Sequence, residues 1–338
     1  MMSRIYITDT TLRDGSHSVS HQYTLKDVER IAGALEEAGV DIVELGHGDG
    51  LTGSTINYGF APYDDFEYIK AGASVLNKSK LAVLLLPGIG TVNDLKKAKE
   101  CGAKVVRVAT HITEADISEQ HIKAAKDMGF FTVGFLMMAH GAPKEKLLEQ
   151  ALLMESYGAD VVYVTDSAGA LLPNEVYERV KLLKDNLKVP IGHHAHNNLG
   201  VAVANSLAAI DAGATYIDGS LIGLGAGAGN TPTEMLVAVL KKMNIETNAD
   251  LYKTIDAGDD VLIPIIKEKG KELPRFTSDS LIIGYAGVYS SFMLHARNAA
   301  EKFGVDVRDI LVELGRRKAV GGQEDWIIEV AYELSKAK

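Results

Sequence analysis

The segment Tyr157-Gly158-Ala159-Asp160-Val161-Val162-Tyr163-Val164 contains the pattern that decides the fold: the end of an amphipathic helix, a glycine, and then a β-branched strand. The glycine fits the position after a helix C-terminus, where a positive φ causes no Cβ strain, and the apolar run is typical of a strand covered on both faces. The same pattern occurs at 37–44, 101–108, 128–133 and 212–217. The repeat therefore predicts helices and strands that alternate around a parallel sheet.

Eight such units can be counted along the chain. Three further apolar runs, Ile5–Thr8, Leu81–Leu86 and Val189–His194, raise the number of predicted strands to eight. Helical patterns lie between the strands, near 25–38, 64–77, 91–101, 114–128, 143–157, 173–186 and 199–212. Eight alternating units in about 245 residues match a (β/α)8 TIM barrel in number and length, and an open, doubly wound sheet is the alternative.

The alternation stops after the helix that begins near Thr231. From about Leu251 the pattern is helical only, near 251–269, 278–302, 306–318 and 323–336. The sequence therefore predicts a (β/α)8 barrel over residues 1–250 and a smaller C-terminal helical region over residues 251–338.

The composition narrows the class of ligand. The 338 residues are 46% hydrophobic and 24% charged, with a formal net charge of -10 and a single cysteine, Cys101. Nucleic acids and anionic membranes require clustered Lys and Arg, which the sequence lacks, so we expect neither as a partner. No apolar run approaches the roughly 20 residues of a membrane span, no signal peptide is visible, and one cysteine permits no internal disulfide. We expect a cytoplasmic protein with a small-molecule ligand.

Reactive side chains follow the predicted strands at the point where each strand ends, which is where barrel enzymes carry their active sites. The first strand is followed by Arg13, Asp14 and His17, and the strand near 189–194 runs into His194 and His196. Further polar residues at predicted strand ends are Glu44, His47, Thr110, His111, His140, Asp166 and Ser167. The sequence therefore predicts one active site at this end of the barrel.

The spacing of His194 and His196 predicts a metal site. Residues two apart on a strand project from the same face, so both imidazoles would point at the barrel axis and could bind one metal ion. Asp14 can supply a third ligand and leave positions open for substrate oxygens. Two buried, hydrogen-bonded structural histidines would give the same spacing, but their place at a strand C-terminus, together with Asp14, favours the metal.

Arg13 and His17 are the other two residues after the first strand for which the sequence predicts a functional role. With Asp14 committed to a metal, the Arg13 guanidinium would be free to meet a carboxylate or enolate oxygen; the alternative is an ion pair. His17 is either a general base or a loop histidine. No lysine ends a predicted strand, which disfavours a Schiff-base aldolase. The glycine-rich run 223–230 lacks the context of a phosphate-binding loop, so we expect a tight loop at the barrel rim.

Two motifs resemble those of a known superfamily. Asp9-Thr10-Thr11-Leu12-Arg13-Asp14-Gly15, together with His194-Ala195-His196-Asn197, resembles the metal-dependent barrels that make or cleave carbon bonds beside a carbonyl, among them hydroxymethylglutaryl-CoA lyase and isopropylmalate synthase. Within that superfamily, His17 and the runs 84–91 and 284–291 are similar to the bacterial 4-hydroxy-2-oxovalerate aldolases. The resemblance extends from about residue 4 to Asp325, with departures at Asn197 and in a longer segment over 267–278.

The resemblance implies a retro-aldol cleavage of 4-hydroxy-2-oxopentanoate to pyruvate and acetaldehyde. It implies a divalent cation, usually Mn2+, held by Asp14, His194 and His196, although Co2+, Mg2+ or Zn2+ would also suit these ligands. Arg13 would stabilise the enolate, and His17 would take the proton of the C4 hydroxyl. Asp14 and His194 would also lie against the substrate.

The resemblance further places Ser167 on the substrate carboxylate and Tyr289 on the substrate or on His17, with Tyr285 as the competing tyrosine. Leu84 and Leu86 alternate on one strand face and would shape the pocket for the aldehyde methyl group. The family usually works bound to an acylating acetaldehyde dehydrogenase, which receives the aldehyde through an internal channel. We therefore expect an oligomeric complex in which the C-terminal helical region binds the partner and completes the active site.

Two other functions stay open at the level of sequence. One is a transferase that condenses an acyl-CoA with a 2-oxo acid on the same barrel and metal; that branch of the superfamily resembles this chain less, because it has glutamine in place of His17. The other is a metal-binding or interaction protein that has lost catalysis. The full set of Arg13, Asp14, His17, His194 and His196 argues against such a loss.

Overall fold

The computed structural model describes residues 4–336 and shows eight parallel strands that close into a barrel in the order β1 to β8. The strands are β1 (Tyr6–Leu12), β2 (Ile42–Leu45), β3 (Lys80–Leu85), β4 (Val105–His111), β5 (Phe131–Met137), β6 (Val161–Asp166), β7 (Ile191–Ala195) and β8 (Tyr216–Gly219). β1 pairs with β8 as well as with β2, so the sheet has no free edge. The predicted (β/α)8 barrel is confirmed, and the open sheet is excluded.

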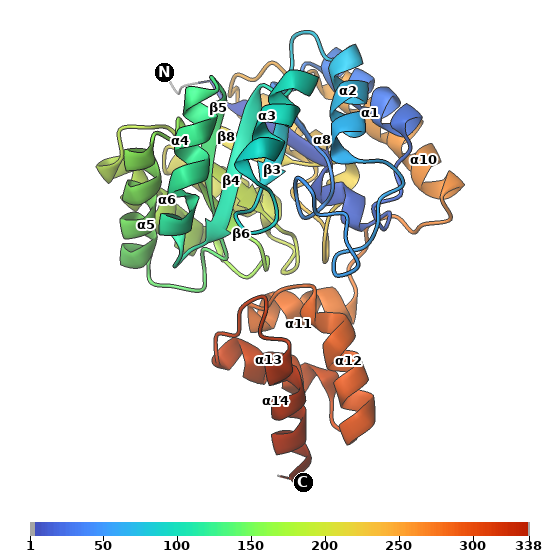
Figure 1. Cartoon of the computed structure of the whole chain (residues 1–338), viewed down its shortest axis with the longest axis vertical. Helices are drawn as coiled ribbons and strands as arrows, with labels where there is room; N and C mark the ends of the chain where they lie inside the picture. The colour runs from blue at the N-terminus through green and yellow to red at the C-terminus, as the bar shows by residue number, and fades with distance from the viewer. Residues whose placement is uncertain (1–3, 337–338) are drawn as a thin grey trace.

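A layer of helices surrounds the strands (Figure 1). It contains α1 (Leu25–Ala38), α2 (Asp65–Val75), α3 (Val92–Cys101), α4 (Glu119–Asp127), α5 (Lys144–Tyr157), α6 (Pro173–Asn186), α7 (Ala202–Asp211) and α8 (Thr233–Lys242). The short 3-10 helices are η1 (Asp14–His17), η2 (Ala115–Ser118) and η3 (Leu221–Gly223). The glycine pattern of the sequence has its expected cause, since Gly158 ends α5 with φ 108°.

The strands separate two apolar layers. The large layer between strands and helices includes Ile7, Val43 and Val106, and the smaller cluster on the barrel axis includes Leu84, Phe135 and Tyr163. The pairing of β1 with β2 shifts register between Asp9 and Leu12. Such an irregularity re-aims the side chains that follow it, and here Arg13 and Asp14 follow.

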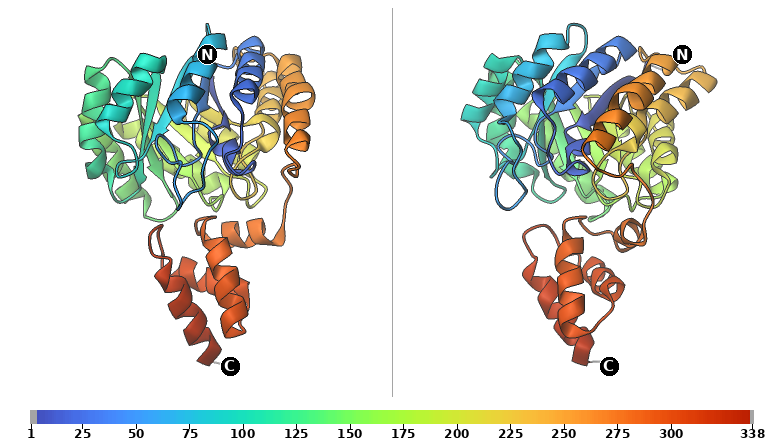
Figure 2. Two further views of the ribbon diagram at one scale, coloured as in Figure 1. Left: turned by 45° about the vertical axis from the view of Figure 1, so that its right-hand side comes forward. Right: turned by 90° about the vertical axis from the view of Figure 1, so that its right-hand side faces the viewer.

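The C-terminal part of the chain is helical, as predicted. α9 (Leu251–Asp256), the π-helical η4 (Ala257–Leu262) and α10 (Ile263–Glu268) pack on the outside of the barrel beside α1. α11 (Ser278–Ala286), α12 (Phe292–Phe303), α13 (Val307–Arg316) and α14 (Asp325–Lys336) form a separate body below the barrel (Figures 1 and 2).

This separate body has an apolar cluster of its own, which includes Val288, Phe292 and Leu314. The continuous helical segment predicted near 278–302 is wrong. Gly287 adopts φ 65° and ends α11, and α12 begins only at Phe292. Among residues 4–336, no helix is long and apolar enough to cross a membrane.

Candidate active site

A cavity of about 580 Å³ opens at the carboxyl ends of the strands. Its wall brings together the nine site residues expected from the sequence and the resemblance: Arg13, Asp14, His17, Leu84, Leu86, Ser167, His194, His196 and Tyr289. The competing Tyr285 is 73% exposed on α11 and does not line this cavity. The structure therefore places all nine in one site, while their individual roles remain predictions.

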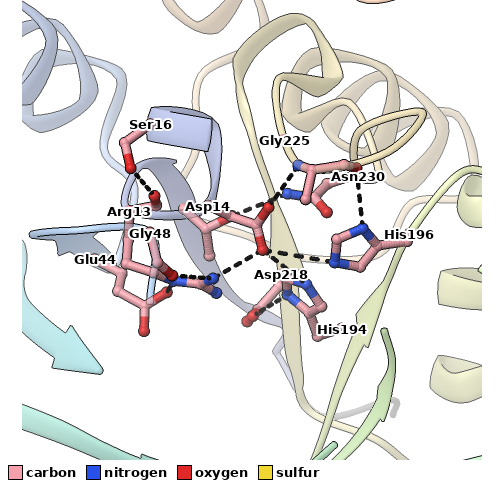
Figure 3. Close-up of polar contacts among 12 residues, drawn as sticks. Arg13, Asp14, Ser16, Glu44, Gly48, His194, His196, Asp218, Gly225 and Asn230 are labelled. Carbon is pink, nitrogen blue, oxygen red and sulfur yellow. Dashed lines mark hydrogen bonds and ion pairs between the residues drawn. The ribbon is translucent and has the colours of Figure 1, made fainter. Parts of the chain in front are cut away.

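Asp14, His194 and His196 form a buried cluster that can hold a metal ion (Figure 3). Asp14 Oδ2 lies 3.6 Å from His194 Nε2 and 3.5 Å from His196 Nε2. The other nitrogen of each ring faces an acceptor: His194 Nδ1 lies 2.8 Å from Asp218 Oδ2, and His196 Nδ1 lies 3.3 Å from the Ala226 carbonyl oxygen. When each Nδ1 donates, each Nε2 turns its lone pair toward Asp14, which fits a divalent cation.

The charges around this cluster favour a cation. Burial alone would raise the pKa of Asp14, but Arg13 and His196 outweigh it and hold that pKa well below its ordinary value. Burial would lower the pKa of His194, yet the Asp14 and Asp218 carboxylates raise it above its ordinary value. The carboxylates thus stabilise positive charge at His194, as they would at a bound metal.

The glycine-rich run 223–230 forms the tight rim loop that the sequence predicts, and it anchors Asp14. The Ala226 backbone N–H donates to Asp14 Oδ1 at 2.9 Å. A Cβ at Gly225 would lie 3.0 Å from the same oxygen and 2.6 Å from Asn230 Nδ2. The close approach of the loop therefore requires a glycine at this position, and it fixes the orientation of Asp14.

Arg13 differs from the expectation of a free guanidinium. Its Nε donates to Glu44 Oε2 at 2.8 Å, and its Nη1 donates to Asp14 Oδ2 at 2.8 Å. The expectation of a free guanidinium was wrong because Glu44, a fully buried residue of β2, lies within hydrogen-bond distance of Arg13. Only Nη2 of this guanidinium is buried without a partner among the described residues, so one NH2 group is left for a ligand.

His17 ends η1 and packs against Gly48, whose Cα leaves room for the ring: a Cβ there would lie 2.5 Å from His17 Nε2. Its neighbour His21 lies edge-on at 4.9 Å between ring centroids. Burial, together with His17 and His47, lowers the pKa of His21 to about 3. His21 is therefore uncharged near pH 7.

Several polar residues at strand ends do not line the cavity. His47 Nε2 faces the Gly59 carbonyl oxygen at 3.0 Å, and His140 Nε2 faces the Gly287 carbonyl oxygen at 3.0 Å. Asp166 accepts from the backbone N–H groups of Ala170 and Leu171, both at 3.0 Å. These side chains hold loops at the rim, and the sequence alone does not separate them from site residues.

The sequence reasoning missed two buried residues beneath the cluster, Arg107 of β4 and Asp218 of β8. Arg107 Nη1 donates to Glu44 Oε2 at 3.0 Å, and its Nη2 donates to Asp218 Oδ2. Arg107 is 1% exposed. Arg107 could have been noticed in the sequence as a charged residue within the apolar run 105–108. Asp218 could not be noticed in this way, because its strand is only four residues long.

The barrel belongs to the HMGL-like family, because it matches the model of that family. The model of the HMGL-like family matches residues 4–261, and a DmpG-like communication domain matches residues 274–336. Two solved structures share the fold. They are the N-terminal domain of a putative aldolase from Bacteroides vulgatus (24% identity, 85% of this chain and 94% of that chain covered, TM-score 0.73) and the carboxyl transferase domain of Rhizobium etli pyruvate carboxylase (18% identity, 99% and 61% covered, TM-score 0.82).

Relatives of known name match almost the whole length of the chain. A 4-hydroxy-2-oxovalerate aldolase of Carboxydothermus hydrogenoformans is 60% identical, with 100% of this chain and 99% of the relative covered. Another of Geobacillus stearothermophilus is 59% identical, with 99% and 96% covered. The chain belongs to the 4-hydroxy-2-oxovalerate aldolase family, whose members are lyases. The resemblance inferred from the motifs is confirmed.

Proposed function

We propose that this protein catalyses the metal-dependent retro-aldol cleavage of 4-hydroxy-2-oxopentanoate to pyruvate and acetaldehyde. The observation that carries the proposal is the joint placement of the Asp14, His194 and His196 cluster, the Nη2 group of Arg13 and the imidazole of His17 in the wall of one cavity. A retro-aldol cleavage needs these three functions: a site for the 2-oxo acid, a donor for the enolate and a base for the hydroxyl.

Asp14, His194 and His196 would hold the cation, for which we propose Mn2+. Two imidazoles and one carboxylate leave coordination positions for oxygen ligands, and a substrate with a carboxylate and a 2-oxo group offers two. A bound divalent ion would supply Lewis acidity that favours enolate formation.

The side chains of the protein have the following roles in the proposed reaction. His17 takes the proton of the C4 hydroxyl, the C3–C4 bond breaks, and C4 becomes the carbonyl carbon of acetaldehyde. The electron pair of that bond forms the enolate of pyruvate, and Arg13 Nη2 donates a hydrogen bond to the enolate oxygen. The proton taken up by His17 is returned to C3, directly or through water, which completes pyruvate and restores the neutral base. Glu44 holds Arg13 in place throughout.

Four further residues would bind the substrate. Ser167 would donate to the substrate carboxylate; its Oγ already accepts from the Met138 backbone N–H at 3.2 Å, which orients it. Tyr289 would contact the substrate or His17. Leu84 and Leu86 lie on β3 and just after it, and they would form the apolar wall for the aldehyde methyl group.

We also propose that an acylating acetaldehyde dehydrogenase binds the C-terminal helices and receives the aldehyde through a channel in the resulting complex. The match of residues 274–336 to a DmpG-like communication domain supports this partner. So does the position of Tyr289, Ser290 and Ser291, which join α11 to α12 and also line the cavity. Co-expression with such a dehydrogenase should give one co-eluting complex on a sizing column, and separate elution would contradict the partner.

The central test is an assay of pyruvate release from 4-hydroxy-2-oxopentanoate by protein loaded with Mn2+. We expect turnover that a chelator abolishes and added Mn2+ restores. No turnover, or turnover that survives the chelator, would refute the metal-dependent aldolase. A parallel reaction with acetyl-CoA and a 2-oxo acid separates the condensing transferase, for which release of free CoA would be the product signal.

A further inference from the structure

Arg107 is among the largest fully buried side chains of the described residues, and it packs against Phe135 and Tyr163 of the apolar cluster on the barrel axis. A buried guanidinium is costly unless its charge is paired and its N–H groups are bonded. Arg107 pairs its charge with two carboxylates that come from different strands, Glu44 of β2 and Asp218 of β8, through Nη1 and Nη2, whereas its Nε has no partner among the described residues. It therefore spans the interior of the barrel.

Each of these carboxylates uses the same oxygen for a second partner in the active site. Glu44 Oε2 accepts from Arg107 Nη1 at 3.0 Å and from Arg13 Nε at 2.8 Å. Asp218 Oδ2 accepts from Arg107 Nη2 and lies 2.8 Å from His194 Nδ1. One guanidinium thus connects the residue proposed to face the enolate with a proposed metal ligand, although it does not line the cavity itself.

We propose that Arg107 is the positioning residue of this site. By holding Glu44 and Asp218 at a fixed separation, it sets the direction of Arg13 Nη2 and keeps Asp218 as the acceptor of the His194 Nδ1 proton. With that proton on Nδ1, His194 Nε2 keeps its lone pair for a metal. The inference rests on the proposed function for the role of Arg13, but its effect on metal binding does not depend on which reaction the site catalyses.

The surroundings of Arg107 select an arginine over a lysine. Its guanidinium carbon lies 4.3 Å from the ring centroid of Phe135 and 4.7 Å from that of Tyr163. Tyr163 can take this place because Gly192 has no side chain: a Cβ there would lie 2.2 Å from the Tyr163 ring. The planar guanidinium, held between the two rings, can donate to both carboxylates at once. A lysine ammonium has neither the shape nor the reach to do so.

The first experiment compares Arg107→Lys with Arg179→Lys, a half-buried arginine of α6 that donates to the Ala139 and Glu175 carbonyl oxygens. The dissociation constant of Mn2+ is measured by calorimetry on metal-free protein, with the folded state checked by circular dichroism. We expect Arg107→Lys to weaken Mn2+ binding by about 10- to 100-fold and to lower kcat, and Arg179→Lys to change neither. A folded Arg107→Lys protein with wild-type Mn2+ affinity would overturn the proposal.

The second experiment asks whether Arg107 acts through Asp218. In an Asp218→Asn background, Arg107→Lys should change the Mn2+ dissociation constant by less than about 3-fold, because the link is already broken. A further loss as large as in the wild-type background would overturn the proposal, since a structural role elsewhere gives additive effects.

A third variant covers the case in which Arg107→Lys does not fold. Tyr163→Leu removes one aromatic face and no charge, and we expect it to weaken Mn2+ binding by about 3- to 10-fold. Unchanged affinity in this variant would refute the positioning role. If the wild-type protein binds Mn2+ but does not cleave 4-hydroxy-2-oxopentanoate, the proposed function fails while these binding measurements still decide the role of Arg107.

Discussion

Replacing Gly48 by alanine is expected to displace His17 and to leave the metal cluster intact. A Cβ at Gly48 would lie 2.5 Å from His17 Nε2, 2.6 Å from its Cε1 and 2.8 Å from its Cδ2. Ordinary van der Waals contact begins near 3.4 Å, so the ring has to move by about 0.9 Å. The imidazole is the end of a rotatable side chain and can move, and Gly48 does not have the positive φ that would strain an alanine.

The expected loss follows from this displacement. A catalytic group misplaced by about 1 Å costs roughly 10²-fold in rate, which corresponds to about 2.7 kcal/mol in the barrier. The Mn2+ affinity of the cluster should not change, because none of its three residues contacts Gly48. Asp14 contacts Arg13, His194 contacts Asp218, and His196 contacts Ala226. We therefore expect kcat for pyruvate release to fall about 100-fold at unchanged Mn2+ affinity.

The matched control is Gly33→Ala in α1, where a new Cβ meets no atom within 4 Å and kcat should stay at the wild-type value. A double-mutant test then isolates His17: in a His17→Ala background, Gly48→Ala should cost nothing more. Wild-type kcat in the Gly48→Ala protein would refute the reasoning. A full second loss in the His17→Ala background would do so too, because the added methyl would then act on some other group.

The remaining predictions concern the base, the tyrosine and a buried carboxyl group. His17→Ala should lower kcat by roughly 10²- to 10⁴-fold at full metal content, measured by elemental analysis; loss of the metal would identify His17 as a ligand instead. Tyr289→Phe should lower kcat/KM for 4-hydroxy-2-oxopentanoate, whereas Tyr285→Phe should not, because of these two tyrosines Tyr289 alone lines the cavity; the reverse order would reassign the site tyrosine. Burial raises the pKa of Asp9 from 3.8 to about 6, so the native state holds this proton more tightly than the unfolded state does. The free energy of unfolding should therefore fall as the pH rises from about 4 to about 6, by at most about 3 kcal/mol. Urea unfolding at several pH values should show that Asp9→Asn flattens this slope and that the exposed Asp185→Asn does not; an equal slope in both variants would contradict the assignment.

The barrel could be predicted because its signal is local and repeated. A glycine such as Gly158 and the β-branched strand after it report a helix end and a buried strand within eight residues, and the pattern recurs along the chain. Strand ends then share one face of the barrel by topology alone. For that reason the sequence suffices to bring Asp14 and His194 together, although they are far apart along the chain.

The support beneath the site could not be predicted in the same way. The pairing of Arg107 with Asp218 depends on the register and on the inward side of two strands that are distant in sequence, and no local pattern encodes it. Whether the Arg13 guanidinium is free or paired depends on the position of Glu44 within β2. The break at Gly287 was missed because a left-handed glycine and an ordinary helical glycine look alike in a sequence.

The segment that joins α11 to α12 has a thermodynamic consequence. Tyr289, Ser290 and Ser291 belong to a body with its own apolar cluster, yet they complete the wall of a cavity whose other walls belong to the barrel. A protein that binds α11 to α14 and shifts this segment changes the free energy of any ligand held in the cavity. Linkage makes that effect reciprocal, so a substrate in the cavity must change the affinity for the protein by the same factor. Substrate in the cavity and a protein bound to α11 to α14 would therefore affect each other's binding without a second ligand pocket.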